Sequence, residues 1–184
     1  ALGRRRSPTG IAGRARTVII GSGRTFARAA AREAAALGFR PVVRLDAIRG
    51  EARICGPDLV AAFEALRGRR PACLIATGES VVKVRGRGRG GRNQELALSS
   101  IEALSKCSRP TVLAAFATDG MDGPSKAGGG LVDDHTARRA RTRGVSIRAA
   151  LDQNDSATAL HRLGGLMAGG PTGTNVADVT VLVG

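Results

Sequence analysis

Short apolar runs alternate with longer amphipathic stretches along most of the chain, and the two patterns predict different elements. Apolar runs bounded by turn residues are typical of buried strands, whereas apolar residues three or four positions apart predict helices. The predicted strands cover residues 18–20, 41–45, 73–76, 80–84, 111–117 and 177–183. The predicted helices cover residues 24–37, 56–66, 93–106, 135–143 and 154–163. This alternation predicts an α/β fold, a mostly parallel sheet with helices on both faces.

The first 16 residues differ in character from the rest of the chain. This segment, ALGRRRSPTGIAGRAR, contains five arginines and no hydrophobic periodicity, so we expect a flexible, basic lead-in. The remaining residues, 17–184, are enough for a single α/β domain with a core of its own. Within them, residues 17–46 have the length and order of strand, helix and strand, which predicts a βαβ unit.

The chain of 184 residues carries a formal net charge of +14, from 29 lysines and arginines against 15 acidic residues. Such an excess is typical of nucleic-acid binding, but nearly all of these basic residues are arginines, which a GC-rich genome also produces. Binding of single strands relies on stacking against aromatic side chains, and the aromatic residues here are four phenylalanines. We therefore expect no nucleic-acid partner. A loosely binding glycine- and arginine-rich segment is the alternative.

Other functional classes are disfavoured by what the sequence lacks. No apolar run approaches the roughly 18 residues that a membrane-spanning helix needs, so we expect no membrane partner. The basic lead-in does not have the pattern of a secretory signal. Cys55, Cys73 and Cys107 are odd in number and far apart, which argues against disulfides and against a zinc site. These features predict a soluble cytoplasmic protein.

Four polar loops each follow a predicted strand, and they are the candidate functional segments. They cover residues 77–80, 85–95, 118–130 and 169–175. In open α/β sheets, ligands bind outside the carboxyl ends of the strands. Four such loops on one sheet therefore predict a shared functional rim.

The second loop, RGRGRGGRNQE, leads directly into a predicted helix. Glycines such as Gly90 and Gly91 let backbone N–H groups approach an anion, and the positive end of the helix dipole favours negative charge there. Arg92, at the helix start, can clamp two oxygens of a carboxylate or phosphate at once. The loop therefore predicts an anion cradle. The alternative is a solvated segment.

The third and fourth loops carry oxygen ligands and donors. Asp119 follows a buried strand and Asp122 lies three residues on, a pattern that suits Mg²⁺ held with substrate phosphates or, equally, a base for a hydroxyl. Asp-Gly pairs are also common turn formers, which is the structural alternative. In GGPTGTN, the hydroxyls of Thr172 and Thr174 and the amide of Asn175 can face a ligand, or the segment can be a plain loop.

Several of these segments together resemble one known family, the MOFRL-type glycerate 2-kinases. The matching strings are GEAR at 50–53, TGESVVKVRGRGRGGRNQELAL at 77–98, ATDGMDGP at 117–124, QNDS at 153–156 and GPTGTNVAD at 170–178. They resemble the C-terminal half of that family, in the same order. The similarity extends over residues 17–184, with the MOFRL-like motifs in 72–184.

The resemblance implies a reaction, in which the ATP γ-phosphoryl group passes to the 2-hydroxyl of D-glycerate with Mg²⁺ as cofactor. It also implies two α/β domains with the active site between them, and a homo-oligomer is possible. Because the motifs match one half, we expect the N-terminal partner domain to be missing and this fragment to be inactive alone. Some members of the family carry the name hydroxypyruvate reductase, so that activity is the alternative prediction. The turn at residues 21–23 lacks the rest of a dinucleotide fingerprint.

The resemblance also assigns roles to residues of this chain. It implies that Glu79, Arg92, Asp119 and Asn175 are catalytic. The candidates for binding phosphate or substrate are Gly90, Gly91, Thr172, Gly173 and Thr174, and the candidate metal ligands are Asp119 and Asp122. One departure from the family pattern is the string Thr-Gly-Glu-Ser at 77–80, where the family usually has Gly-Gly-Glu-Thr.

Overall fold

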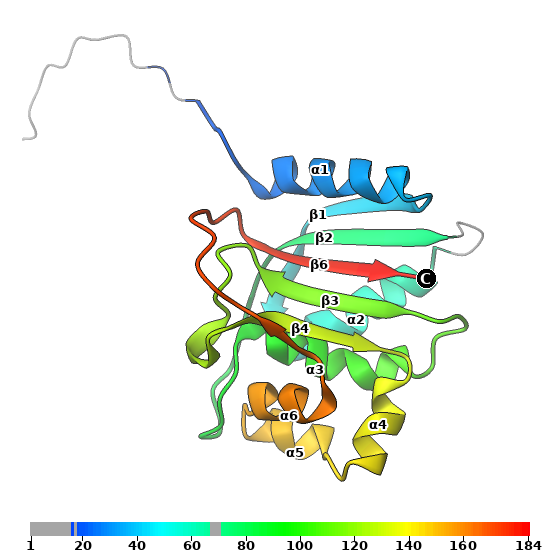
Figure 1. Ribbon diagram of the computed structural model, residues 1–184, viewed down its shortest axis with the longest axis vertical. Helices are drawn as coiled ribbons and strands as arrows, with labels where there is room; N and C mark the ends of the chain where they lie inside the picture. Colours follow the sequence, from blue (N-terminus) through cyan, green and yellow to red (C-terminus); the bar gives the residue numbers. More distant parts are fainter. Residues whose placement is uncertain (1–15, 17, 67–70) are drawn as a thin grey trace, which may run out of the picture.

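The computed structural model describes residues 16, 18–66 and 71–184, and a six-stranded sheet organises them (Figure 1). The strand order across the sheet is β1-β2-β6-β3-β4-β5. The strands are β1 (Arg40–Glu51), β2 (Ala72–Val81), β3 (Val112–Ala117), β4 (Ala127–Asp133), β5 (Leu166–Ala168) and β6 (Asp178–Val183). The α/β class predicted from the sequence is confirmed.

The sheet is mixed rather than mostly parallel, which corrects the prediction. Only β1 and β2 pair in parallel, whereas β6 is antiparallel to both of its neighbours, β2 and β3, and the pairs β3–β4 and β4–β5 are antiparallel too. The cause is the placement of β6, which enters between β2 and β3 from the edge where those two strands end. Asp178, its first residue, is opposite Gly78 on one side and Ala117 on the other.

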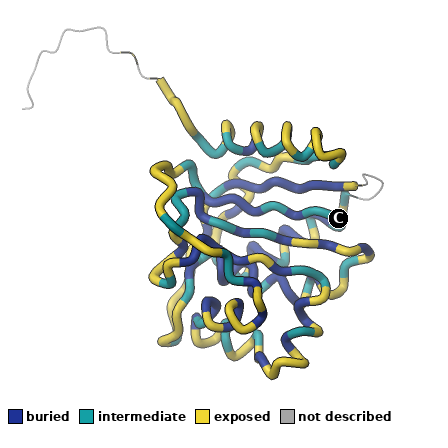
Figure 2. The backbone as a smooth tube through the Cα atoms, viewed as in Figure 1, coloured by how far each residue is buried: buried dark blue, intermediate teal, exposed yellow. Residues whose placement is uncertain are grey.

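Helices cover both faces of the sheet, as predicted. The side chains of β2 alternate between the two faces, so that Cys73 and Ile75 pack under α1, whereas Leu74 and Ala76 face α2 and α3. Figure 2 shows the resulting burial of the central strands. The helices are α1 (Gly23–Ala36), α2 (Ala52–Glu64), α3 (Arg92–Leu104), α4 (Thr136–Thr142), α5 (Ile147–Asp152) and α6 (Ser156–Leu163), with a 3-10 turn, η1 (Gly123–Ser125).

Helix α3 is the best anchored of these helices. Its residues Leu96, Leu98, Ile101 and Leu104 are all 0% exposed, and full burial of each such side chain is worth about 1.5–3 kcal/mol. Gly56 of α2 allows a close approach, because a Cβ there would lie 2.5 Å from the carbonyl oxygen of Leu96. The start of α3 is therefore a rigid platform for the side chains that it carries.

The N-terminal part departs from the sequence prediction. Val18, Ile19 and Ile20 form no strand and are 65%, 78% and 95% exposed, so the predicted βαβ unit is wrong. A strand needs a partner for its backbone, and among the described residues this segment has none. The predicted lead-in, apart from residue 16, lies outside the described residues. Helix α2 begins at Ala52, earlier than predicted, which places Pro57 inside it.

Some elements were merged or missed. The strand predicted at 73–76 and the start of the one predicted at 80–84 form a single strand, β2, which ends at Val81, so the prediction of strand for residues 82–84 is wrong. Strands β4 and β5 and helix α5 were not predicted, because β4 has the glycine-rich sequence AGGGLVD and the other two span three and six residues. Within the described ranges, no helix combines the length and apolarity needed to span a membrane.

Candidate active site

The loops predicted to share a rim do lie at one edge of the sheet. The hydroxyl of Thr118, after β3, donates to the carbonyl of Ala177 (2.7 Å) and accepts from the N–H of Val176 (2.9 Å). The hydroxyl of Thr172 donates back to the carbonyl of Thr118 at 2.6 Å. The third and fourth loops are thus fastened to each other beside the ends of β2 and β3.

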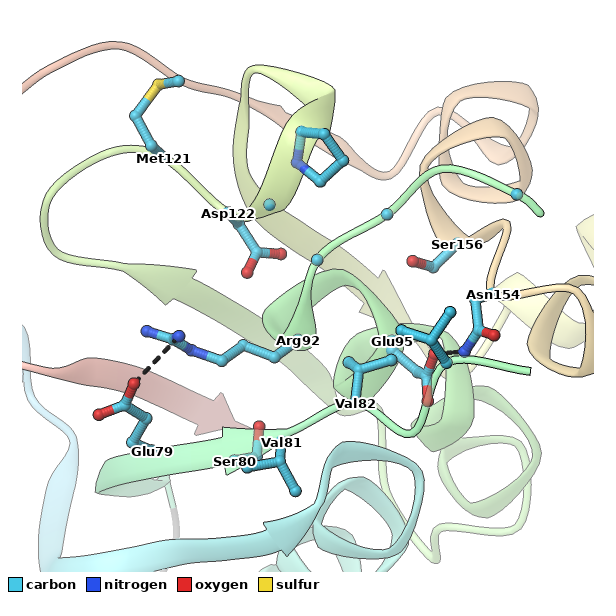
Figure 3. Close-up of a pocket in the computed structure, with 16 residues that line it drawn as sticks. Glu79, Ser80, Val81, Val82, Arg92, Glu95, Met121, Asp122, Asn154 and Ser156 are labelled. Atoms are coloured by element: carbon cyan, nitrogen blue, oxygen red, sulfur yellow. Dashed lines mark hydrogen bonds and ion pairs between the residues drawn. The ribbon is translucent and has the colours of Figure 1, made fainter. Parts of the chain in front are cut away.

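A pocket of about 450 Å³ opens at this edge (Figure 3). It lies between the end of β2, the glycine-rich loop, the start of α3, the loop after β3 and the start of α6. Its apolar lining includes Val81, Val82, Val84 and Met121, while its polar lining comes from carboxylates, one arginine, an asparagine and two serines. The pocket can therefore accommodate a ligand with both apolar and charged parts.

Arg92 occupies the mouth of this pocket, and it contacts two carboxylates. Its Nη1 lies 3.0 Å from Oε1 of Glu79, and its Nη2 donates to Oδ1 of Asp178 at 3.0 Å while Nε donates to the other oxygen of Asp178. The hydrogen bond to Asp178 is the main reason why the pKa of Arg92 is raised above its ordinary value. Asp178 is 1% exposed, whereas the side chain of Glu79 is 64% exposed. Asp178 therefore fixes the arginine, and Glu79 is free to change partner.

A second arginine–carboxylate cluster contributes Glu95 and Asn154 to the pocket lining, whereas its arginine, Arg53, does not line the pocket. Arg53 donates to Oε1 of Glu95 through Nε (3.2 Å) and Nη2 (3.1 Å), and it also donates to the carbonyl of Leu151 at 3.0 Å. The other oxygen of Glu95 accepts from the amide of Asn154 at 3.0 Å. Both oxygens of the buried Glu95 carboxylate are therefore satisfied by protein donors, as burial of a charge requires.

The same Asn154 holds the glycine-rich loop. Its Oδ1 accepts from the N–H groups of Arg85 (2.7 Å) and Gly86 (3.0 Å), while the next contact along the loop runs from the N–H of Gly88 to the carbonyl of Gln153 at 2.8 Å. Side chains would not fit here, since a Cβ on Gly88 would lie 2.6 Å from that carbonyl oxygen. Close docking against residues 153–156 therefore explains the glycine spacing, in addition to any role in anion binding.

Asp122 caps helix α3 from another loop. Its Oδ1 accepts from the N–H of Asn93 (3.1 Å) and its Oδ2 from the N–H of Gln94 (2.8 Å), and both side-chain amides donate to it as well. Burial raises the pKa of Asp122 above its ordinary value, against the effect of these donors. Because both oxygens are engaged, the geometry favours a structural role for Asp122. Its role as a metal ligand stays a prediction.

Of the other predicted site residues, Gly90 and Gly91 line the pocket, whereas those in the third and fourth loops lie on the rim and do not line it. Asp119 is partly exposed, and its Oδ1 accepts from the N–H of Met121 at 2.9 Å. Asn175 is exposed, and its side-chain oxygen accepts from the N–H of Ala177 at 3.1 Å. The segment of Thr172, Gly173 and Thr174 makes a turn beside Asp119, whose carbonyl accepts from the N–H of Thr172 at 3.2 Å. The structure thus joins Glu79 to Arg92 directly and leaves Asp119 and Asn175 in the adjoining loops.

Sequence reasoning missed two polar residues that line this pocket, Glu95 and Asn154, and two that hold lining side chains in place, Asp178 and Arg53. Each lies inside a string that carried the family resemblance, yet none was given a role. The available signal was a charged or amide side chain next to apolar positions, as in VAD and NQEL. Burial of a charge at such a position requires a partner, and that requirement could have prompted a search for one.

Comparison with known sequences agrees with this architecture. The sequence model of the MOFRL family matches residues 72–178. This chain belongs to the MOFRL family. A glycerate 2-kinase from Pyrococcus horikoshii is 37% identical over 171 residues, which cover 90% of this chain. The crystal structure of a glycerate kinase from Thermotoga maritima aligns with a TM-score of 0.84 at 38% identity and also covers 90% of this chain.

Two further facts qualify what the relatives say about this MOFRL chain. The matched region covers 38% of the Pyrococcus protein and 41% of the Thermotoga structure, so the chain spans about two fifths of their lengths. An Agrobacterium vitis protein provisionally named hydroxypyruvate reductase is also similar, at 40% identity over 164 residues, or 85% of this chain. The shared family therefore comes with two different activity names.

Proposed function

We propose that this MOFRL chain supplies the phosphoryl-transfer site of a glycerate 2-kinase. In that reaction the γ-phosphoryl group of ATP passes to the 2-hydroxyl of D-glycerate, giving 2-phosphoglycerate. The observation that carries the proposal is the position of Arg92, which Asp178 holds at the mouth of the pocket and beside the start of α3. The names of the Pyrococcus and Thermotoga relatives support the same activity.

The arrangement suits phosphoryl transfer because that chemistry depends mainly on positioning and on neutralising charge. Two nitrogens of Arg92 are fixed by the buried Asp178, and the third contacts Glu79. When Glu79 turns toward solvent, Nη1 of Arg92 can bind a phosphoryl oxygen without any movement of the arginine. Glu79 is then available to accept the proton of a substrate hydroxyl or to bind the metal ion that accompanies ATP.

The residues of this chain can provide part of a Mg²⁺ site. Asp119 has a carboxylate that is partly exposed on the rim, and Mg²⁺ is often bound by one or two carboxylates together with substrate phosphates and water. Among the described residues, no three His, Cys, Asp or Glu side chains gather closely enough to hold a metal by themselves. Asp119 would therefore bind the ion, and the ion would supply charge neutralisation at the phosphates.

The turn at residues 21–23 favours the kinase over a nicotinamide-dependent reductase. Ser22 is the N-cap of α1, where its side chain accepts from the N–H of Thr25 (3.2 Å) while the Thr25 hydroxyl accepts from the N–H of Ser22 (2.7 Å). This capping box accounts for the serine without a dinucleotide. The docked glycine-rich loop likewise differs from a free tail that binds nucleic acid, since its backbone is hydrogen-bonded to residues 153–155.

The test is an assay of phosphoglycerate formation from D-glycerate and ATP–Mg²⁺, run on this chain and on the longer polypeptide to which we expect it to belong. We expect activity in the longer polypeptide and none in this chain alone. The Arg92→Ala variant should lose the activity, while Arg148→Ala, an exposed arginine on α5, should keep it. A parallel assay with NADH and hydroxypyruvate provides the contrary outcome, because NADH oxidation without use of ATP would overturn the proposal.

A further inference from the structure

Two serine hydroxyls in the pocket are buried and have no hydrogen-bond partner. Ser80 and Ser156 are each 1% exposed, and within the described part of the chain neither Oγ atom has a partner. Both residues line the pocket, Ser80 from the end of β2 and Ser156 from the first turn of α6 (Figure 3). An unpaired buried hydroxyl carries a desolvation penalty that a ligand with acceptor atoms would remove.

Backbone donors lie next to Ser156. Gly90 and Gly91 precede α3, and among the described residues their N–H groups have no hydrogen-bond partner, in contrast to those of Gly88 and Arg89 in the same loop. Gly90 also sets the approach of the serine, because a Cβ there would lie 2.0 Å from Oγ of Ser156. The first-turn N–H groups of Asn93 and Gln94 already donate to Asp122, so the N–H groups of Gly90 and Gly91, just before the helix, are the ones that remain for a ligand.

The carboxylates that line the pocket do not compete for these donors. Glu95 is held by Arg53 and by Asn154. Asp122 accepts from the backbone and side chains of Asn93 and Gln94, and Glu79 contacts Arg92. Arg89, in the glycine-rich loop, adds positive charge beside the pocket, since its Nη2 donates to the carbonyl of Pro124, a lining residue, at 3.3 Å. The side-chain oxygens of Asn93 and Gln94 are also unpaired, but these two residues do not line the pocket. Among the groups that do line it, the two serine hydroxyls and the two glycine N–H groups can donate to a ligand that brings acceptor oxygens.

We propose that the hydroxyls of Ser156 and Ser80, with the N–H groups of Gly90 and Gly91, bind an oxyanion group of the substrates. The chemistry is that of a phosphoryl group or of a carboxylate, and the kinase reaction offers both, on the nucleotide and on the hydroxy acid. The inference rests on the proposed function for the identity of the ligand. The assignment of these four donors rests on burial and on their missing partners alone.

The first experiment measures binding by NMR on the isotope-labelled chain, with inorganic phosphate, with ATP–Mg²⁺ and with D-glycerate as separate probes. We expect the amide signals of Gly90 and Gly91 to shift with one of these probes. Ser156→Ala should weaken that binding about tenfold or more, as the loss of one hydrogen bond to a charged group implies. Shifts with phosphate or ATP would identify a phosphoryl subsite, and shifts with D-glycerate alone a carboxylate subsite.

A matched control is Ser105→Ala, an exposed serine at the other end of α3, which should change the affinity less than twofold. Stability provides a second readout. Because the hydroxyl of Ser156 has no partner in the described structure, Ser156→Ala should unfold at the same or a slightly higher urea concentration, whereas a structural hydroxyl would lower it. Unchanged affinity in both Ser156→Ala and Ser80→Ala, or no shift with any probe, would overturn the inference.

The failure of this inference can be told apart from failure of the proposed function. If the longer polypeptide forms phosphoglycerate and both serine variants keep the KM of each substrate, the subsite is refuted and the kinase stands. If an oxyanion binds in a Ser156-dependent way but no phosphoglycerate forms, the kinase is refuted and the subsite stands.

Discussion

Two arginine–carboxylate clusters border the same pocket, and they differ in how far water reaches them. In the mouth, the side chains of Arg92 and Glu79 are 34% and 64% exposed. In the interior, those of Arg53 and Glu95 are 16% and 3% exposed. The partners are similar in chemistry, and their surroundings set what each cluster can do.

The difference separates a binding role from a positioning role. An exposed carboxylate can leave its arginine at little cost, since water solvates both charges, so the outer cluster can exchange Glu79 for a ligand. A buried carboxylate cannot, because an unpaired charge in the interior is strongly unfavourable. The inner cluster therefore stays closed, and through Asn154 it holds the glycine-rich loop in place.

The largest effect should come from breaking the outer cluster. We predict that Arg92→Ala lowers the rate of phosphoglycerate formation by about 10³-fold or more, by analogy with arginine clamps in other phosphoryl transfers. The measurement is steady-state kinetics on the longer polypeptide, with circular dichroism to check that the variant is folded. If the rate falls by less than about tenfold, Arg92 does not take part in the reaction, and the outer cluster has no binding role that distinguishes it from the inner one.

Breaking the inner cluster should instead destabilise the fold. Arg53→Ala leaves the Glu95 carboxylate buried with only Asn154 as a side-chain partner, so we expect a loss of about 3 kcal/mol in the free energy of unfolding. Urea denaturation measures it. The control is Arg148→Ala, whose pair with Asp152 is exposed and 3.9 Å apart, and which should change stability by less than about 0.5 kcal/mol. Equal effects of the two variants would contradict the contrast.

The link between the inner cluster and the loop is Asn154, which has a φ of +53°. Asn154→Ala removes the side-chain oxygen that accepts from the N–H groups of Arg85 and Gly86. It also places alanine, which tolerates positive φ less well than asparagine, at this position. We therefore expect the free energy of unfolding to fall by about 2 kcal/mol. Hydrogen exchange of those two amides should accelerate, as measured by NMR. The neighbouring Gln153→Ala keeps the backbone contacts and should leave exchange unchanged. If the amides stay protected in Asn154→Ala, the loop is held by other contacts.

A third pair, Asp133 with Arg139, lies away from the pocket and tests the comparison at intermediate exposure. Burial raises the pKa of Asp133, but hydrogen bonds from Arg139 and Thr136 outweigh it, and the net pKa is lowered from 3.8. A lowered pKa means that the carboxylate stabilises the fold above about pH 4, and that this contribution is lost as pH falls through the folded-state value.

We therefore expect Asp133→Asn to lower the free energy of unfolding by about 1 kcal/mol at pH 7. The difference in this free energy between the variant and the wild type should narrow toward pH 3. Urea denaturation at several pH values measures it. Asp152→Asn, which breaks an exposed pair 3.9 Å apart, should change the free energy of unfolding at pH 7 by less than about 0.5 kcal/mol. A gap for Asp133→Asn that stays constant down to pH 3 would refute the predicted linkage.

Local pattern predicted most of the helices but not the topology of the sheet. Helices α1 and α3 were predicted from apolar residues on one helical face, because that signal lies within each segment, and α4 and α6 were also named as candidates. The same local pattern does not predict which strands pair with β6. Its place between β2 and β3 depends on contacts with residues far away in sequence, so a parallel sheet was expected where a mixed one exists.

The candidate site was predictable to a similar degree. Motif resemblance selected Glu79 and Arg92, and the structure joins them. It gave no role to Asp178, whose contact with Arg92 spans 86 positions in sequence. Nor did the spacing of the glycines distinguish an anion cradle from a loop docked on residues 153–156, since both need backbone without side chains. To distinguish these two roles, the residues that contact the glycine-rich loop must be known.

The central position of β6 also has a consequence for how the protein is made. Strands β2 and β3 are synthesised well before the strand that joins them, so during translation two separate halves of the sheet must wait with unpaired edges. Until β6 pairs with both strands, these edges are open to pairing with another chain. A premature stop shortly before residue 178 should leave an aggregation-prone product, even though it retains Glu79 and Arg92.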